Sequence, residues 1–154
     1  MNDKTISQEY ANGLIFELEK AFWDERGKGA RFRVTTVGRE FFKAECLPRL
    51  QSTEIDDMIH VVESTLREKG IVSQVSATRD GRLLRVRIEG CAHRAVEDRL
   101  VAQATKPFTC VPANLIVLAI EEKLDRPAEL AEIKLEDGAC HVLIALFDQR
   151  PVLA

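Results

Sequence analysis

The sequence lacks the short motifs that mark the commonest cofactor and catalytic sites. It contains no G-x-G-x-x-G or Walker loop, no H-E-x-x-H, no G-x-S-x-G and no C-x-x-C, so no sequence motif indicates any of these well-known cofactor or catalytic sites. It also lacks an uninterrupted run of ~18 apolar residues, and the polar start Met1–Gln8 has no apolar signal-peptide core. We therefore expect a cytoplasmic protein without membrane insertion, and we favour a binding function over an enzymatic one.

An excess of positive charge is missing as well. The chain carries 22 Lys and Arg against 25 Asp and Glu, for a net charge of -3, whereas nucleic-acid binding needs clustered cations. The nearest thing to a basic stripe is Arg79, Arg82, Arg85 and Arg87, which fits a solvated strand face better. We expect no nucleic-acid partner.

The composition is that of one folded domain. Apolar residues make up 45% and charged residues 31% of the 154 positions, and a chain of this length buries about 70% of its unfolded surface. No repeat, low-complexity tract or long Gly/Ser linker divides it. We predict a single domain over 1–154, with a helical half at 1–70 and a hairpin-helix-helix-hairpin half at 71–154.

Three helices are expected in the first half. Ser7–Trp23 repeats apolar residues at three- and four-residue steps, and this stripe consists of Leu14, Ile15, Leu18, Ala21 and Phe22. A short helix is expected at Val37–Leu47, which Pro48 ends. The third helix begins at Thr53, in a sequence that resembles a capping box, and stops at Gly70.

Two hairpins are expected in the second half. The strands Ile71–Ala77 and Leu83–Glu89 flank a turn at 79–81, and the strands Glu132–Leu135 and Ala139–Phe147 flank a turn at 136–138; both turns contain Asp-Gly. The last strand is apolar on both faces, which predicts a central strand covered on both sides.

Two helices lie between the hairpins, at about Ala95–Gln103 and Pro112–Leu124. The second is apolar almost all round, as a helix is when it is buried in a core or in an oligomer interface. The order of elements favours an α+β fold, in which an antiparallel sheet of about four strands packs against about five helices.

Three of the four cysteines fall at the ends of expected elements. Cys91 follows a strand, Cys110 precedes a helix and Cys140 opens the last strand. Thiols are kept reduced in the cytoplasm, and the ends of elements can converge on a zinc ion, which prefers four ligands. The spacing therefore makes a zinc site one candidate.

A fourth zinc ligand would have to come from nearby. His93 is the better histidine, because alternate residues of an extended segment share a face and His93 is two residues from Cys91. His141 follows Cys140 directly and would point to the other face. Glu129 or Glu132 could supply a carboxylate instead.

Two other interpretations of these thiols stay open. Free cysteine is among the most buried residue types, so the three could simply belong to the core, as we expect for Cys46. Cys110 is also the best nucleophile for a cysteine-dependent enzyme acting on a small molecule, because a helix N-terminus lowers the pKa of a nearby thiol.

The second half resembles a known superfamily. The segments Val86–Cys91, Pro107–Cys110 and Asp137–Val142 look like the C-terminal half of the 4-vinyl-reductase-like and methanogen-output-type domains, whose superfamily includes the TRAPP vesicle-tethering subunits. The resemblance implies a dimeric α+β domain with an apolar channel or pocket, which binds small hydrophobic molecules, serves as a sensory input or assists tetrapyrrole reduction. It also implies zinc ligands at Cys110 and Cys140, with Cys91 or a glutamate as the third.

The sequence and the resemblance together favour a homodimeric binding or sensory module for a small apolar ligand, with structural zinc as its one candidate cofactor. We expect Phe41, Phe42, Leu115 and Leu118 to line the ligand pocket. The alternatives are an enzyme that uses Cys110 and a purely structural or interaction subunit.

Overall fold

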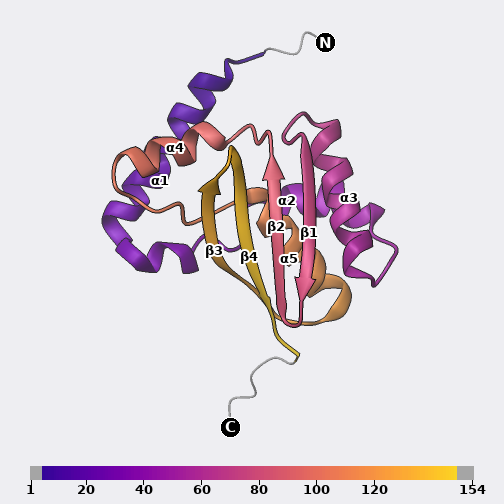
Figure 1. Ribbon diagram of the computed structural model, residues 1–154. Helices are drawn as coiled ribbons and strands as arrows, with labels where there is room; N and C mark the ends of the chain where they lie inside the picture. Colours follow the sequence, from indigo (N-terminus) through magenta and orange to yellow (C-terminus); the bar gives the residue numbers. More distant parts are fainter. Residues whose placement is uncertain (1–4, 149–154) are drawn as a thin grey trace.

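The computed structural model describes residues 5–148, which form an α+β fold with an antiparallel sheet of four strands (Figure 1). The strand order is β1-β2-β4-β3. The strands are β1 (Gln74–Asp80), β2 (Leu83–Glu89), β3 (Ala128–Glu136) and β4 (Ala139–Leu146). The predicted fold class is confirmed, and β2 and β4 are the central pair, with β1 and β3 at the edges.

The second hairpin turns at the predicted Asp-Gly pair, whereas the first turns one residue later than predicted, at Gly81 and Arg82, because Asp80 still pairs with Leu83. Asp137 and Gly138 both have positive φ, of 52° and 74°, as a two-residue turn that matches the twist of antiparallel strands requires. The first strand begins later than expected and β3 begins earlier, at Ala128 rather than Glu132. The residues added to β3 pair with the end of β4, which gives them a ladder that the sequence pattern alone did not indicate.

The helices lie behind the sheet and beside its two edges. They are α1 (Gln8–Arg26), α2 (Arg39–Phe41), α3 (Ile55–Glu68), α4 (Arg94–Ala102) and α5 (Val111–Leu124), with short turns of other helix types at η1 (Gly27–Phe32), η2 (Phe42–Cys46) and η3 (Leu47–Arg49). Figure 1 shows α5 behind the sheet, α3 beside β1, and α1 with α4 on the side of β3. None of the helices within residues 5–148 is long and apolar enough to cross a bilayer.

The main core forms around α5, as its all-round apolar sequence predicts. Every residue from Pro112 to Ile120 is buried, because the helix packs on the sheet on one side and on α3 and η2 on the other. The sheet contributes alternate residues such as Val86 and Ile144, and α3 contributes residues such as Val62. Each fully buried side chain of this size stabilises the fold by roughly 1.5–3 kcal/mol, so this interface dominates the fold.

A second, smaller apolar cluster joins α1, η1 and α4. Its buried members are Phe16, Ala30, Val96, Leu100 and Phe108. The guanidinium carbon of Arg99 lies 4.1 Å from the centroid of the Phe16 ring, a cation–π contact that also holds α4 against α1. The main core therefore lies under the sheet, and the second cluster lies at a corner beside β3.

The buried face of α1 matches the predicted stripe only in part, since Ile15 and Phe22 pack against the second cluster. Leu14 and Leu18 are 47% and 64% exposed, whereas Asn12 and Phe16 are buried. The reason is a polar anchor, because the Asn12 side-chain amide donates a hydrogen bond of 2.8 Å to the carbonyl oxygen of Ala92. That bond turns Phe16 toward α4 and leaves Leu14 and Leu18 facing outward.

The start of α3 is also stabilised differently from the prediction. The helix begins at Ile55, and Thr53 is not its cap; the Ser52 hydroxyl instead accepts the Glu54 N–H at 2.9 Å and donates to the Asp57 carboxylate. On the same helix, Glu63 accepts the Val75 N–H at 2.7 Å. This bond satisfies a backbone donor of edge strand β1.

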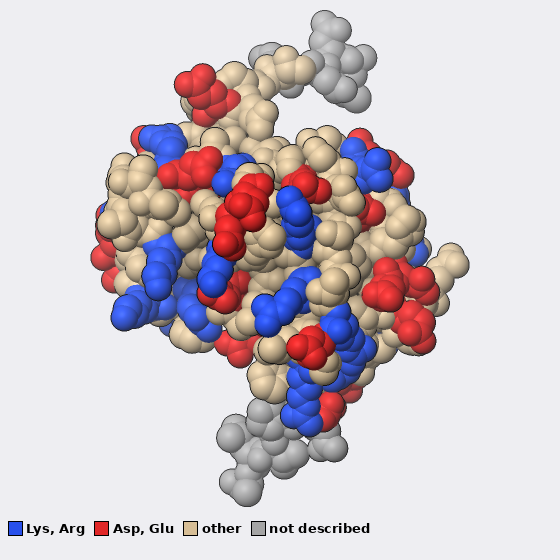
Figure 2. Space-filling view, in the orientation of Figure 1, with Lys and Arg blue, Asp and Glu red and all other residues tan. Residues whose placement is uncertain are grey.

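The prediction that β4 is covered on both faces is wrong. Its residues alternate between buried side chains and the half-buried His141, Leu143 and Ala145, because helices pack on only one face of the sheet in the part of the chain that the structure describes. Figure 2 views the open face and shows acidic and basic side chains interspersed over it. The exposed Arg85 and Arg87 lie on this face, as predicted for a solvated strand face.

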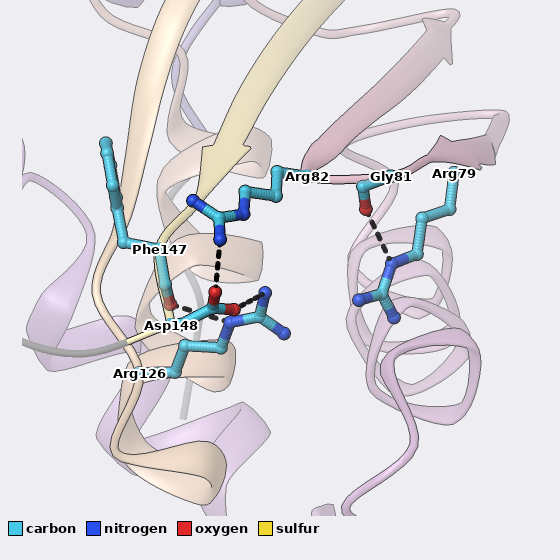
Figure 3. A network of polar contacts seen from close by, with 6 residues as sticks. All are labelled: Arg79, Gly81, Arg82, Arg126, Phe147 and Asp148. Atoms are coloured by element: carbon cyan, nitrogen blue, oxygen red, sulfur yellow. Dashed lines mark hydrogen bonds and ion pairs between the residues drawn. The ribbon is translucent and has the colours of Figure 1, made fainter.

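The end of β4 is tied down by a small polar network (Figure 3). Asp148 forms ion pairs with Arg82, in the first hairpin turn, and with Arg126, in the loop before β3. The Arg126 Nε also donates a hydrogen bond of 2.7 Å to the Phe147 carbonyl oxygen. Arg82 and Asp148 are more than half exposed, so their ion pair orders the strand end more than it stabilises the fold.

Candidate functional site

Three cysteine side chains and one carboxyl group gather at the end of the sheet where β2 stops and β4 starts. Cys91 follows β2, Cys110 is the residue before α5, and Cys140 lies in β4 opposite Ile88 of β2. The Cys140 thiol donates to the Glu97 carboxylate of α4, with a sulfur–oxygen distance of 3.5 Å. The charge of Glu97 also acts on Cys91 and Cys110, so we call these four side chains the cysteine–glutamate cluster.

A glycine sets the position of Cys91. Gly90 has a φ of 64°, and a Cβ at this position would lie 1.9 Å from the Ser73 hydroxyl, so no other residue fits without displacing the chain. The chain turns there, and the Ala92 N–H donates to the Ile71 carbonyl oxygen at 2.7 Å. The turn directs Cys91 toward α4.

Burial raises the pKa of every thiol in the cluster. The pKa of Cys140 rises to about 12 and that of Cys110 rises well above its usual range, in both cases first through burial and then through the charge of Glu97. Burial also raises the pKa of Cys91. The thiols are therefore protonated at neutral pH, which agrees with Cys140 acting as a hydrogen-bond donor.

The pKa values of two carboxyl groups, those of Glu97 and Glu19, are also raised. Burial raises the pKa of Glu97 to about 7, although its hydrogen bond to Cys140 and the nearby Arg94 act in the opposite direction. The pKa of Glu19, on α1, rises to about 7 through burial and through the charge of Glu97. Burial at the junction of α1, α4 and β4 thus opposes negative charge.

This environment does not favour Cys110 as a nucleophile. The helix N-terminus beside Cys110 lowers a thiol pKa, but burial of this side chain, which is only 4% exposed, outweighs that effect. A reactive cysteine needs access to its substrate and a thiolate near neutral pH. Cys110 has neither in this conformation.

The donor set is chemically suited to a metal ion, although the side chains are not arranged around one. Three thiols and a carboxyl group are ligands that zinc accepts in protein sites. Within residues 5–148, no group of three or more Cys, His, Asp or Glu side chains is placed so that it could hold an ion without adjustment. Glu97, which was not among the predicted ligands, is the carboxyl group that lies beside the three thiols.

The side chains of His93, Glu129 and Glu132, three of the other predicted ligands, have other partners, although the His93 backbone N–H donates to the Cys91 sulfur at 3.4 Å. The Nδ1 of His93 is 3.4 Å from the Asn12 side-chain oxygen, and burial lowers the His93 pKa. His141 faces the open side of the sheet, where its Nε2 is buried and has no hydrogen-bond partner among the described residues. Glu129 forms an ion pair with Arg31, and Glu132 forms one with Lys134.

Glu97 could have been found from the sequence by one signal. It is three residues before Leu100, and both side chains are buried on the same side of α4. A carboxylate on the apolar side of a short helix, between two cysteines of a candidate metal site, is unusual because buried carboxylates are rare unless they are paired.

A second feature is a long groove of about 1240 Å³ beside edge strand β3. Every residue from Pro127 to Leu135 lines it, so the strand presents its edge to the groove rather than one face. The opposite wall consists of the end of α1, η1 and the loop between α4 and α5, and its aromatic residues are Trp23, Phe32 and Phe108. Phe32 and Val101 remain 63% and 52% exposed.

One buried asparagine holds this wall in place. The Asn114 side-chain amide, in the first turn of α5, donates to the carbonyl oxygens of Val34 and Val37 at 3.2 and 3.1 Å and contacts the Thr109 hydroxyl at 3.2 Å. These bonds join the segment after η1 and the loop before α5 to the main core. The groove is therefore bounded by fixed backbone on that side.

The expected pocket residues pack in the core instead. Phe42, Leu115 and Leu118 are buried in the main core and Phe41 packs against it, while the groove is lined by other residues. The reason is that α5 is covered on all sides, which leaves no space around Leu115 and Leu118. A smaller cavity of about 200 Å³ lies between α3 and β1, and Asp56, His60 and Glu63 make it polar.

The shifted carboxyl groups predict how stability depends on pH. Because the pKa of Glu97 in the folded protein is about 7 and its ordinary value is 4.5, metal-free protein should lose stability as the pH rises from about 4.5 to above 7. The loss attributable to Glu97 is on the order of 3 kcal/mol. Glu97→Gln should therefore flatten this pH dependence, which urea unfolding in the presence of a chelator would measure.

A matched control is Glu122→Gln, which replaces an exposed carboxylate of α5. It should leave the pH dependence as in the wild type. An unchanged slope between pH 4.5 and 8 in Glu97→Gln would contradict the buried environment described for this residue.

Comparison with known protein families and curated proteins gives no relative of the chain. No model of a known protein family matches the chain, and a search of curated proteins gives no match. The resemblance to the 4-vinyl-reductase-like superfamily therefore stays a prediction. What can be inferred about function comes from the cysteine–glutamate cluster and the groove.

Proposed function

We propose that the chain is a binding or sensory module and that a small apolar ligand occupies the groove beside β3. The observation that carries the proposal is the exposure of large apolar side chains in a concave site of about 1240 Å³. Ligand sites are typically concave, lined mostly by apolar and aromatic residues, and equipped with a few polar groups. Covering this lining would remove apolar surface from water at a gain of roughly 25 cal/mol per Å².

The frame of the groove also supports ligand binding. Asn114 fixes one wall through three hydrogen bonds, and β3 is paired with β4 on both sides of an irregularity at Ala131. A ligand that enters a site formed in advance does not have to order its walls, so more of the contact energy appears as affinity.

The chain contains a built-in reporter for this proposal. Trp23 is the only tryptophan of the sequence and lines the groove. The neutral apolar dye N-phenyl-1-naphthylamine should accept excitation energy from Trp23 on binding. Val101→Glu should weaken binding about tenfold, because it places a charge among apolar groove residues, and titration of the energy transfer would measure this.

Val37→Glu is the matched control, since Val37 is exposed and does not line the groove. It should bind the dye within about twofold of the wild type. Equal binding by Val101→Glu and the wild type, or dye binding without energy transfer from Trp23, would place the ligand outside the groove.

We also propose that Cys91, Cys110 and Cys140, with Glu97 as the fourth ligand, hold structural zinc. The support is electrostatic and chemical: buried acidic groups repel one another's charge, and their donor atoms suit zinc. Zinc would supply the positive charge that stabilises these groups in their ionised forms. The protein would hold the donors on four separate segments, namely the end of β2, α4, the start of α5 and β4, so binding would stabilise the fold.

Metal analysis tests the zinc proposal directly. Protein purified without added metal should contain about one zinc per chain, and Cys110→Ser and Cys140→Ser should lose it while circular dichroism shows that they remain folded. Cys46→Ser is the control, because Cys46 is buried elsewhere in the main core. Wild-type protein free of metal would end the proposal, and so would full zinc content in both variants.

The outward face of α1 supports the proposal that two copies form a homodimer. Tyr10, Leu14 and Leu18 follow one another at four-residue steps and are exposed, which makes an apolar stripe along the helix. A stripe of this kind is self-complementary when two copies of a helix pack around a twofold axis. The same stripe also favours the alternative that the chain is an interaction subunit.

Negative charge introduced into this apolar stripe tests the dimer. Leu14→Glu with Leu18→Glu should convert a dimer to a monomer in light scattering coupled to gel filtration. Exposed residues are replaced, so folding should be unaffected. A control double variant, Val37→Glu with Val101→Glu, should stay dimeric, and a monomeric wild type at micromolar concentration would refute the proposal.

A further inference from the structure

The groove carries a charge opposite to that of the whole chain. Its lining includes the cations Lys28, Arg31, Lys106 and Lys134 against the carboxylates Glu129 and Glu132, whereas the chain has a net charge of -3. An excess of cations in an apolar site attracts and orients an anionic ligand.

Two of these cations have no ion-pair partner within residues 5–148. Arg31 lies 3.4 Å from Glu129 and Lys134 lies 3.5 Å from Glu132, so each carboxylate already has a partner. Lys28, on η1, and Lys106, in the loop between α4 and α5, form no ion pair within residues 5–148. Both lysines belong to the wall that also carries Trp23 and Phe108. Apolar surface and free positive charge therefore occur on the same side of the groove.

The shape of the groove restricts the ligand further. Residues of β3 from Ala128 to Leu135 line it, and this strand of 9 residues extends about 30 Å at about 3.3 Å per residue. A compact aromatic molecule would fill only a part of such a groove, whereas an extended chain can follow it. The unpaired backbone edge of β3 forms the polar side, so an apolar chain would lie against the aromatic wall opposite.

Resting on the proposed function of the groove, we propose that its ligand is a long-chain monocarboxylic acid. The alkyl chain packs along Trp23, Phe32 and Phe108, and the ammonium groups of Lys28 and Lys106 bind the carboxylate. Charge-assisted hydrogen bonds to a carboxylate are about twice as strong as neutral ones. The neutral alcohol of the same chain length would keep the apolar contacts and lose this contribution.

The experiment uses the full chain and compares an acid with its alcohol. cis-Parinaric acid, a fluorescent C18 fatty acid that accepts energy from tryptophan, would report binding next to Trp23. Hexadecanoic acid and hexadecan-1-ol would then compete with it below their aggregation concentrations. We expect the acid to compete about tenfold more strongly than the alcohol, which is about 1.4 kcal/mol.

Removing the two charges should remove the preference. In Lys28→Gln with Lys106→Gln, acid and alcohol should compete within about twofold of each other, while alcohol binding stays as in the wild type. Lys43→Gln with Lys123→Gln is the control, because it changes the net charge equally and neither residue lines the groove. It should keep the tenfold preference.

The failures of the two proposals can be told apart. Equal competition by acid and alcohol in the wild type would overturn the carboxylate inference and leave an apolar groove. Loss of all binding, including that of N-phenyl-1-naphthylamine, would overturn the proposed function as well. Displacement of the probe by an extended apolar peptide with a blocked C-terminus, but not by the acid, would assign the groove to strand addition at the β3 edge instead.

Discussion

The fold depends on the burial of α5 between the sheet and the helices of the N-terminal half. The segment from Pro112 to Ile120 is buried throughout, so α5 contacts the sheet with one side and α3 and η2 with the other. Side chains are closely packed around this helix. Both candidate sites lie away from its buried middle: the cysteine–glutamate cluster at one end of the sheet and the groove beside β3.

The start of α5 connects these two sites. Cys110 caps the helix and belongs to the cluster, Phe108 lines the groove two residues earlier, and Asn114 fixes the groove wall one turn later. The backbone bond from the Asn114 N–H to the Cys110 carbonyl oxygen, at 2.9 Å, is part of this turn. One short segment thus carries residues of both sites and is held by the most tightly buried helix of the molecule.

Much of the fold could be predicted from the sequence, because its signals are local. Asp-Gly turns between alternating strands specify hairpins, and the apolar α5 specifies a core helix. The full buried face of α1 could not be predicted, since Leu14 and Leu18 have the same spacing as a buried stripe. The side that turns inward makes nonlocal contacts instead, in which Asn12 and Gln8 donate to the Ala92 carbonyl oxygen. The convergence of three cysteines followed from their places at element ends, and Glu97 had a local signal in its place on the apolar side of α4. The groove depends on how α1 and α4 dock beside β3, which no local pattern encodes.

The zinc proposal implies two protonation states of the cysteine–glutamate cluster. Without a cation, burial keeps the thiols protonated and holds the pKa of Glu97 at about 7, so the cluster is nearly neutral and Cys140 can donate to Glu97. With a divalent cation, the same groups would have to release their protons, because thiolates and carboxylates are the forms that bind metal. Burial destabilises the ionised side chains when no cation is present. When a cation shares the site, burial strengthens their attraction to it, since charges attract more strongly where water is excluded. The buried position of these four side chains is thus compatible with a neutral core and with a metal site, and the number of protons bound distinguishes the two.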